Sequence, residues 1–230
     1  MAITASMVKE LREMTGAGMM DCKKALTATE GDMDKAVDFL REKGLAGAQK
    51  KAGRIAAEGI VATCISEDEK HAVVVEVNAE TDFVAKNEKF KTYVAEVAAQ
   101  AVNTQAEDIE GFMAEKWALD PSMTVKEKLS SMISIIGENM NIRRFAKVSE
   151  ENGIVVSYIH AGGKIGVLVD VETDVVNDAI KEMAKNVAMQ AAALKPQYTT
   201  RAEVDADYIS REKEILLAQI MNDPKESQKP

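Results

Sequence analysis

The residues that could carry chemistry are few in this sequence. Neither of its two histidines, His71 and His160, has a second ligand at the spacing that a metal site needs. Two cysteines, Cys22 and Cys64, have neither a metal-ligand nor a redox spacing, which favours reduced thiols of the kind found in cytosolic proteins. These residue types and spacings predict no catalytic centre, no metal site and no cofactor site. We therefore expect the chain not to be an enzyme.

One glycine-rich segment, "HAGGKIG" at residues 160–166, superficially resembles a phosphate-binding loop. Its lysine is not followed by serine or threonine, and the segment lies within a predicted β-hairpin. Turn geometry therefore explains its glycines better than phosphate binding does. Cys22 lies near the start of a predicted helix, but no base accompanies it, so a thiol nucleophile is not expected.

Three large apolar side chains occur at predicted turns. Phe83 lies where a strand passes into a helix, and Met19 and Met20 follow the glycine-bounded segment "TGAG". Pattern alone favours a structural interpretation, in which the methionines fill a small core and Phe83 covers the end of a sheet. The alternative is that they contact a partner, because methionine and aromatic side chains are favoured at interfaces.

Composition excludes several classes of function. The chain has 230 residues, of which 46% are apolar and 29% charged, as in a typical globular protein. A net charge of −9 and an aromatic content of 4% argue against direct binding to nucleic acid, which needs concentrated cations and stacking platforms. No run of about 18 apolar residues and no signal peptide is present. We expect a cytoplasmic protein that does not bind membranes.

The N-terminal segment predicts three short helices. Thr4 is expected to cap the first, and Gly31 and Asp32 to separate the second from the third. After these, Gly44 and Gly47 predict a loose, basic linker. The buried side is expected to comprise Val8, Leu11 and Met14 of the first helix and Met33, Ala36, Val37 and Leu40 of the third.

The remainder contains a duplicated unit. Residues 59–82 and 153–174 align with one gap, and each predicts a β-hairpin that is followed by a helix. The two helices carry matching apolar stripes at the same relative positions: Phe90, Tyr93, Val94, Val97, Ala98 and Ala101 in one, and Ile180, Met183, Ala184, Val187, Ala188 and Ala191 in the other. Such a repeat is evidence about structure and says little about chemistry.

Further helices are predicted between and after the repeats. Thr124 and Glu127 form a capping box for one, and an extended segment follows it. Thr200 with Glu203 is expected to cap a last helix, whose apolar side no later segment covers. That side comprises Val204, Tyr208, Ile209, Ile215, Leu216 and Ile220. Either the chain stops before a partner helix, or a second chain covers residues 203–220 by self-association.

Three long motifs resemble one family. "TASMVKELREMTGAGMMDCKKAL", "NAETDFVAKN" and "IGENMNIRR" are similar to segments of elongation factor Ts, the bacterial guanine-nucleotide exchange factors for elongation factor Tu. The resemblance extends from Ile3 to about Ile220, and three separate motifs in the family's order are far more specific than a single glycine motif.

This resemblance implies an α+β architecture. Residues 1–54 would form a ubiquitin-associated-like (UBA-like) domain of three helices, and residues 55–145 and 146–198 the two subdomains of the duplicated core. Residues 199–230 would form one arm of a coiled coil, truncated relative to longer relatives, so that the second subdomain is expected to be incomplete.

The resemblance also implies roles for individual residues. Phe83 would wedge into elongation factor Tu near the bound nucleotide and magnesium ion, with Asp82 making polar contacts beside it. The complete set of implied partner contacts is Thr81, Asp82, Phe83, Val84, Ala85, Lys86 and Asn87, with Arg12, Met19 and Met20 in the first module and His160 on the second hairpin. The partner would be bound in its GDP-loaded and nucleotide-free forms. The alternative is a non-catalytic adaptor whose UBA-like module recruits a protein.

Overall fold

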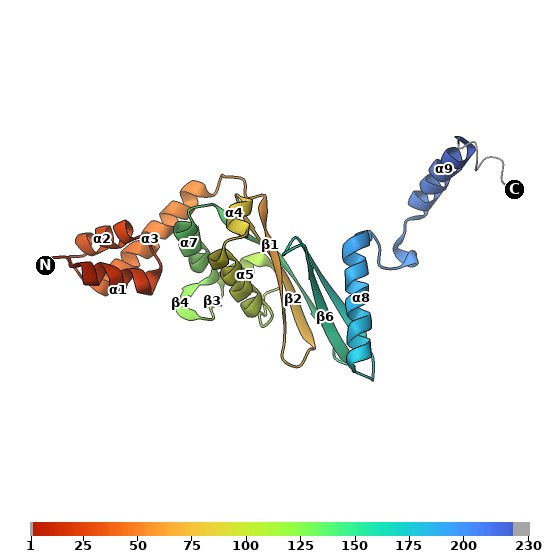
Figure 1. The fold of residues 1–230 in the computed structure, drawn as a ribbon, viewed down its shortest axis with the longest axis horizontal. Helices are drawn as coiled ribbons and strands as arrows, with labels where there is room; N and C mark the ends of the chain where they lie inside the picture. Colours follow the sequence, from red (N-terminus) through yellow and green to blue (C-terminus); the bar gives the residue numbers. More distant parts are fainter. Residues whose placement is uncertain (1, 223–230) are drawn as a thin grey trace. The chain divides into compact units, whose positions relative to one another are not determined.

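The computed structural model describes residues 2–222 and divides into two units, Met1–Ala192 and Ala193–Pro230. The first unit combines helices with antiparallel sheets, and the second is helical (Figure 1). The predicted α+β class is therefore confirmed. The predicted boundaries of the four domains stay predictions.

Three helices form a small N-terminal bundle: α1 (Ala5–Thr15), α2 (Met19–Ala28) and α3 (Met33–Lys51). The predicted caps are present, because the Thr4 side chain accepts from the Met7 amide at 3.3 Å and the Asp32 side chain from the Lys35 amide at 3.1 Å. The core of this bundle comprises Val8, Leu11, Cys22, Ala25, Leu26 and Ala36. Met14 does not belong to it: the prediction that it is buried is wrong, and its side chain is exposed.

The predicted loose linker after the third helix is also wrong. Gly44 and Gly47 lie inside α3, which continues to Lys51. This part of α3 packs along α7 (Val125–Ile136), with Gly44 buried against the α7 backbone, so tertiary contacts override the low helix propensity of glycine. The two lysines at its end suit the negative end of the helix dipole.

The main sheet has the order β1-β2-β5, with β1 (Glu58–Ile65), β2 (His71–Ala79) and β5 (Met140–Ser149) all antiparallel. Helix α5 (Glu88–Ala101) packs against β1 and β2, and its predicted stripe is buried. Between α5 and α7 the chain forms α6 (Ile109–Ala114), β3 (Lys116–Trp117) and β4 (Asp120–Thr124). The predicted capping box of Thr124 and Glu127 starts α7.

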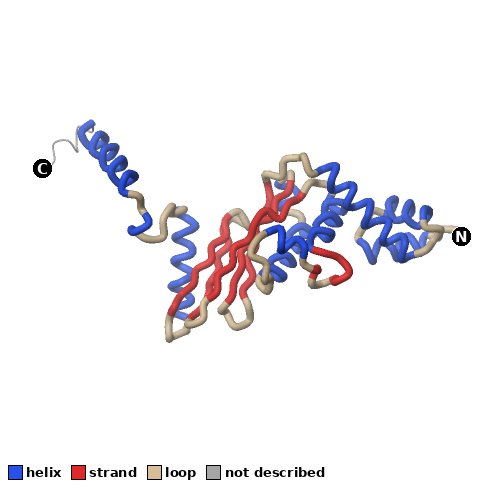
Figure 2. Tube along the Cα trace, turned by 180° about the vertical axis from the view of Figure 1, so that it is seen from behind, coloured by secondary structure: helices blue, strands red, loops and turns tan. Residues whose placement is uncertain are grey.

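The second hairpin, β6 (Gly153–His160) with β7 (Ile165–Glu172), lies beside the first, as Figure 2 shows. The tip of each hairpin is hydrogen-bonded to a strand of the other. The Val61 amide donates to the Gly163 carbonyl at 2.7 Å, and the Val155 amide donates to the Glu69 carbonyl at 2.7 Å. Gly163 has a φ of +98°, and a Cβ there would lie 2.9 Å from the Cβ of Ile60, so turn geometry and close approach both require glycine.

The matching stripe of α8 (Asp178–Leu194) is only partly buried. Its alanines at 184 and 188 are buried, whereas Met183 and Val187 are exposed. The two repeats differ because α5 is enclosed by the sheet and by Trp117, whose ring centroid lies 6.1 Å from that of Tyr93.

The second unit contains a 3₁₀ turn, η1 (Arg201–Glu203), and the helix α9 (Ala206–Asn222). Thr200 and Glu203 hydrogen-bond at this turn and do not start the long helix, so that capping prediction is wrong. Asp205 provides the cap of α9 instead, because its carboxylate accepts from the Asp207 amide at 2.7 Å. No described residue of α9 is buried, as expected for its uncovered apolar side.

The core contains one unsatisfied polar atom that permits a test of the packing. The Tyr93 hydroxyl is buried without a hydrogen-bond partner among the described residues, and burial raises its pKa. An orphaned buried hydroxyl costs about 1–3 kcal/mol. We predict that Tyr93→Phe raises the free energy of unfolding by about 1 kcal/mol, measured as a higher urea midpoint at an unchanged m-value.

Tyr158→Phe is the matched control for this substitution. The Tyr158 hydroxyl lies 2.9 Å from Nδ1 of His160, so its removal deletes a hydrogen bond and should give no stabilisation. A lower urea midpoint for Tyr93→Phe would contradict the prediction.

Candidate functional site

The turn between β2 and α5 is built by hydrogen bonds at both of its ends. It contains a short helix, α4 (Asp82–Ala85), whose N-cap Thr81 accepts from the Val84 amide at 3.4 Å. Asn87 then caps α5 by accepting from the Lys89 amide at 2.9 Å. Two successive caps leave this turn little conformational freedom.

Phe83 projects from this turn into solvent. Two neighbouring side chains face the protein: Ala85 is buried, and Val84 is half-buried against the main core. Phe83, in contrast, is 81% exposed. The interpretation that Phe83 covers the end of the sheet is therefore wrong. The alternative, that it contacts a partner, is consistent with its exposure.

Opposite charges flank the exposed ring. The Lys86 Nζ donates to Oδ2 of Asp82 at 2.7 Å, one helical turn away. This hydrogen bond and charge hold the pKa of the Asp82 carboxyl below its ordinary value, and Asp82 in turn raises the pKa of Lys86. Lys86 is exposed and Asp82 half-exposed, so the pair contributes little to stability and remains accessible to a partner.

The tip of the second hairpin lies close to these charges. Lys164 Nζ donates to Oε2 of Glu58 at 2.7 Å, and Glu58 begins β1, against which α4 packs. Lys164 also lowers the Asp82 pKa, as a minor cause. His160 itself is exposed, and its Nδ1 lies 2.9 Å from the Tyr158 hydroxyl. The fold thus brings this hairpin tip and α4 together, although they are far apart in sequence.

The other predicted contact residues lie on the N-terminal helices. Met19 and Met20 begin α2 and are 59% and 63% exposed, so the interpretation that they fill the small core is wrong. Arg12, in the last turn of α1, is also exposed. These residues lie on different elements from α4, so one partner would have to reach both groups (Figure 1).

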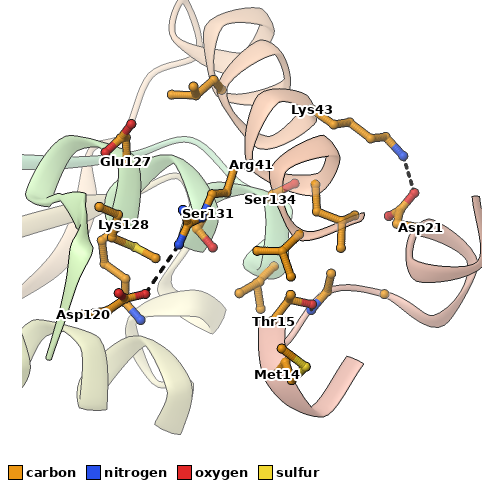
Figure 3. A pocket seen from close by; sticks show the side chains of 17 residues that line it. Met14, Thr15, Asp21, Arg41, Lys43, Asp120, Glu127, Lys128, Ser131 and Ser134 are labelled. Atoms are coloured by element: carbon orange, nitrogen blue, oxygen red, sulfur yellow. Dashed lines mark hydrogen bonds and ion pairs between the residues drawn. The ribbon is translucent and has the colours of Figure 1, made fainter. Parts of the chain in front are cut away.

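Sequence analysis missed a pocket of about 360 Å³ between the N-terminal bundle and the segment containing β4 and α7 (Figure 3). Its walls include Leu40. Four of its charged groups form two ion pairs: Arg41 lies 3.6 Å from Asp120, and Lys43 pairs with Asp21. These pairs join residues distant in sequence, and periodicity gave no signal for them.

Two kinds of chemical group can be checked in the described residues: metal ligands and thiols. No group of three potential metal ligands occurs within residues 2–222. Cys22 is buried, and this burial raises its pKa away from the reactive thiolate range. Among the described helices, none has the length and apolarity to cross a membrane.

Comparison with known proteins shows which family this chain is similar to. The sequence model of a family described as "Elongation factor TS" matches residues 80–230. Elongation factor Ts of Clostridium tetani (strain Massachusetts / E88) is 56% identical over 223 residues, which are 97% of this chain and 73% of the relative. The chain belongs to the elongation factor Ts family.

Other members of the elongation factor Ts family are similar to this chain to nearly the same extent. Those of Clostridioides difficile (strain 630) and Clostridium novyi (strain NT) are 55% and 52% identical, again over 97% of this chain and 73% of each relative. Membership places the chain among the translation elongation factors. The family match includes α4, and the matches to the relatives also extend over most of the N-terminal bundle.

The ion pair beside Phe83 gives a prediction about pH. Since the native pKa of Asp82 is lowered, its interaction with Lys86 stabilises the fold above the ordinary Asp pKa and is lost as pH falls through the lowered value. We predict that Lys86→Met raises the Asp82 pKa toward its ordinary value of 3.8, as measured by NMR titration of the carboxyl carbon.

The control for this titration is Lys89→Met. It removes an exposed lysine from the first turn of α5 and should leave the titration of Asp82 unchanged. An unaltered Asp82 pKa in Lys86→Met would show that the pair does not form in solution.

Proposed function

We propose that this chain is a guanine-nucleotide exchange factor for elongation factor Tu, and that it has no catalytic site of its own. It binds the GDP-loaded factor and promotes the release of GDP. The observation that carries the proposal is Phe83, an aromatic side chain that is 81% exposed on a turn held by two caps. Family membership supplies the partner, and the cytoplasm, where translation factors act, is the proposed location.

Exchange requires the chain to favour one state of its partner. A factor that bound the loaded and empty forms equally would not release nucleotide, however tightly it bound. Acceleration by about ten-thousand-fold needs roughly 5.5 kcal/mol of differential binding. Burial of one phenylalanine contributes roughly 1.5–3 kcal/mol. Phe83 therefore cannot supply the whole effect.

A distributed interface supplies the remainder. Met19, Met20 and Arg12 are proposed to dock the N-terminal bundle, which the proposal identifies as the UBA-like module, on the nucleotide-binding domain. His160 contacts a second domain of the partner. With these contacts made, Phe83 acts at a high effective concentration.

The residues around Phe83 take different parts in the proposed wedge. Asp82, Lys86 and Asn87 have exposed or half-exposed polar groups that can form hydrogen bonds with the partner. Thr81, Val84 and Ala85 are partly or fully buried, and they hold the turn. Because the turn is rigid, the Phe83 ring loses less conformational entropy when it inserts into the partner.

The second unit is proposed to be one arm of a coiled coil. Tyr208, Ile209 and Leu216 of α9 are exposed, as an unpaired arm requires. Self-association through residues 203–220 stays a prediction.

A non-catalytic adaptor is the second candidate function. The exposure of Met19 and Met20 favours it, since these side chains could recruit a helix or a peptide without any effect on nucleotide. An adaptor differs from an exchange factor in being indifferent to the nucleotide state of its partner.

We predict that Phe83→Ala slows the release of GDP from elongation factor Tu by about 10- to 150-fold, the equivalent of the burial energy of one phenylalanine. The melting temperature should not change, because the ring is exposed in the free protein. Stopped-flow release of a fluorescent GDP analogue measures the rate.

Leu119→Ala is the matched control for this substitution. It removes a large apolar side chain that is 69% exposed, at the β3–β4 turn, and it should leave the rate unchanged. Equal rates for Phe83→Ala and the unaltered protein would exclude the wedge.

A second prediction follows from thermodynamic reciprocity. If this chain weakens the binding of GDP to its partner, GDP must weaken the binding of this chain by the same factor. Calorimetric titration of nucleotide-free and GDP-loaded elongation factor Tu should therefore give different dissociation constants. Equal constants would favour the adaptor over the exchange factor.

A further inference from the structure

The segment before Phe83 exchanges hydrogen bonds with a second turn. The carboxylate of Glu138, between α7 and β5, accepts from the Thr81 amide at 3.0 Å through Oε2 and from the Thr81 hydroxyl at 2.7 Å through Oε1. In the reverse direction, Oε1 of Glu80 accepts from the Asn139 amide at 2.5 Å. Residues 80–81 and 138–139 thus hold each other by donors and acceptors on both sides. We call these four residues the clamp.

The clamp includes Thr81, the N-cap residue of α4. Thr81 uses its hydroxyl twice, because it donates to Glu138 and accepts from the Val84 amide. An N-cap is effective only while its side chain keeps the rotamer that faces the helix, and the bond to Glu138 fixes that rotamer. The position of Phe83, two residues later, therefore depends on a carboxylate 57 residues away in sequence.

The clamp also contacts the turn that follows α3. The Asn139 side chain donates to the Arg54 carbonyl at 2.7 Å, and the Arg54 guanidinium lies 3.5 Å from the Glu80 carboxylate. The segment that leads from α3 to β1 is thus bound to the same group of residues. Glu138 itself directly follows Gly137, the C-cap of α7, against which α3 packs.

We propose that Glu138 is a positioning residue for Phe83: by accepting both hydrogen bonds from Thr81, it holds α4 in the orientation in which the ring can insert into the partner. This inference rests on the proposed function. The competing explanation is that the clamp only closes the end of the β2–β5 pair, whose last paired residues are Ala79 and Met140.

The test compares Glu138→Gln in two backgrounds, with Phe83 intact and with Phe83→Ala. Glutamine keeps the size but replaces one of the two accepting oxygens by an NH₂ group, which only donates and so cannot accept from Thr81. With Phe83 intact, the release of the GDP analogue should slow by about 2- to 12-fold, the equivalent of one net hydrogen bond. In the Phe83→Ala background, Glu138→Gln should cause no further loss, because the positioned ring is gone.

Thr81 supplies an independent pair of variants in case Glu138→Gln folds poorly. Thr81→Ser keeps the hydroxyl, whereas Thr81→Val keeps the shape and loses the hydroxyl, so Thr81→Val should slow release more than Thr81→Ser does. Amide hydrogen exchange at Val84 gives a readout without any partner, and it should be faster in Glu138→Gln and Thr81→Val than in Thr81→Ser.

The outcomes separate the positioning role from the proposed function. If Phe83→Ala slows release but Glu138→Gln has no effect, or has the same effect in both backgrounds, the positioning role is overturned and the exchange function stands. If Phe83→Ala itself leaves release unchanged, the wedge and the positioning role are both overturned. A loss from Glu138→Gln that appears only with Phe83 present supports the inference.

Discussion

Exposure of the Phe83 ring is possible only because hydrogen bonds prevent the turn that carries it from collapsing. Burying such a ring would gain roughly 1.5–3 kcal/mol, so a flexible turn would fold it against the nearby sheet. Thr81 and Asn87 cap the helices on either side, and Ala85 is buried between them. These contacts fix the backbone on both sides of Phe83. The ring therefore stays in water, where a partner can reach it.

The two hairpins of the duplicated unit support the turn that carries Phe83. The tip of each hairpin accepts a backbone hydrogen bond from a strand of the other: the Gly163 carbonyl accepts from the Val61 amide, and the Glu69 carbonyl from the Val155 amide. Lys181 of α8 also binds the Glu69 carboxylate, at 2.7 Å from Oε1. Each hairpin thus restrains the turn of the other. The repeat, which carries no chemistry in itself, holds the polar tip near α4.

The parts of this fold that depend on neighbouring residues could be predicted from the sequence. The caps at Thr4 and Asp32 and the two hairpins need only local donors, acceptors and alternation. The continuity of α3 through Gly44 could not be predicted, because it depends on contact with α7. The exposure of Phe83 was likewise undecided, since the same residues are compatible with a buried ring. Glu138, a partner distant in sequence, gives no local signal.

The continuity of α3 changes how the two proposed contact regions cooperate. A loose linker would let the N-terminal bundle move independently, so docking by Met19 and Met20 would restrict Phe83 only weakly. A helix that packs along α7, and whose following turn is bound to the clamp through Arg54, joins these regions through a continuous series of contacts. Docking of the bundle then orients the turn as well as bringing it near. The proposed action on a partner's nucleotide site requires no catalytic group in this chain, because what the chain would contribute is the fixed placement of its exposed side chains.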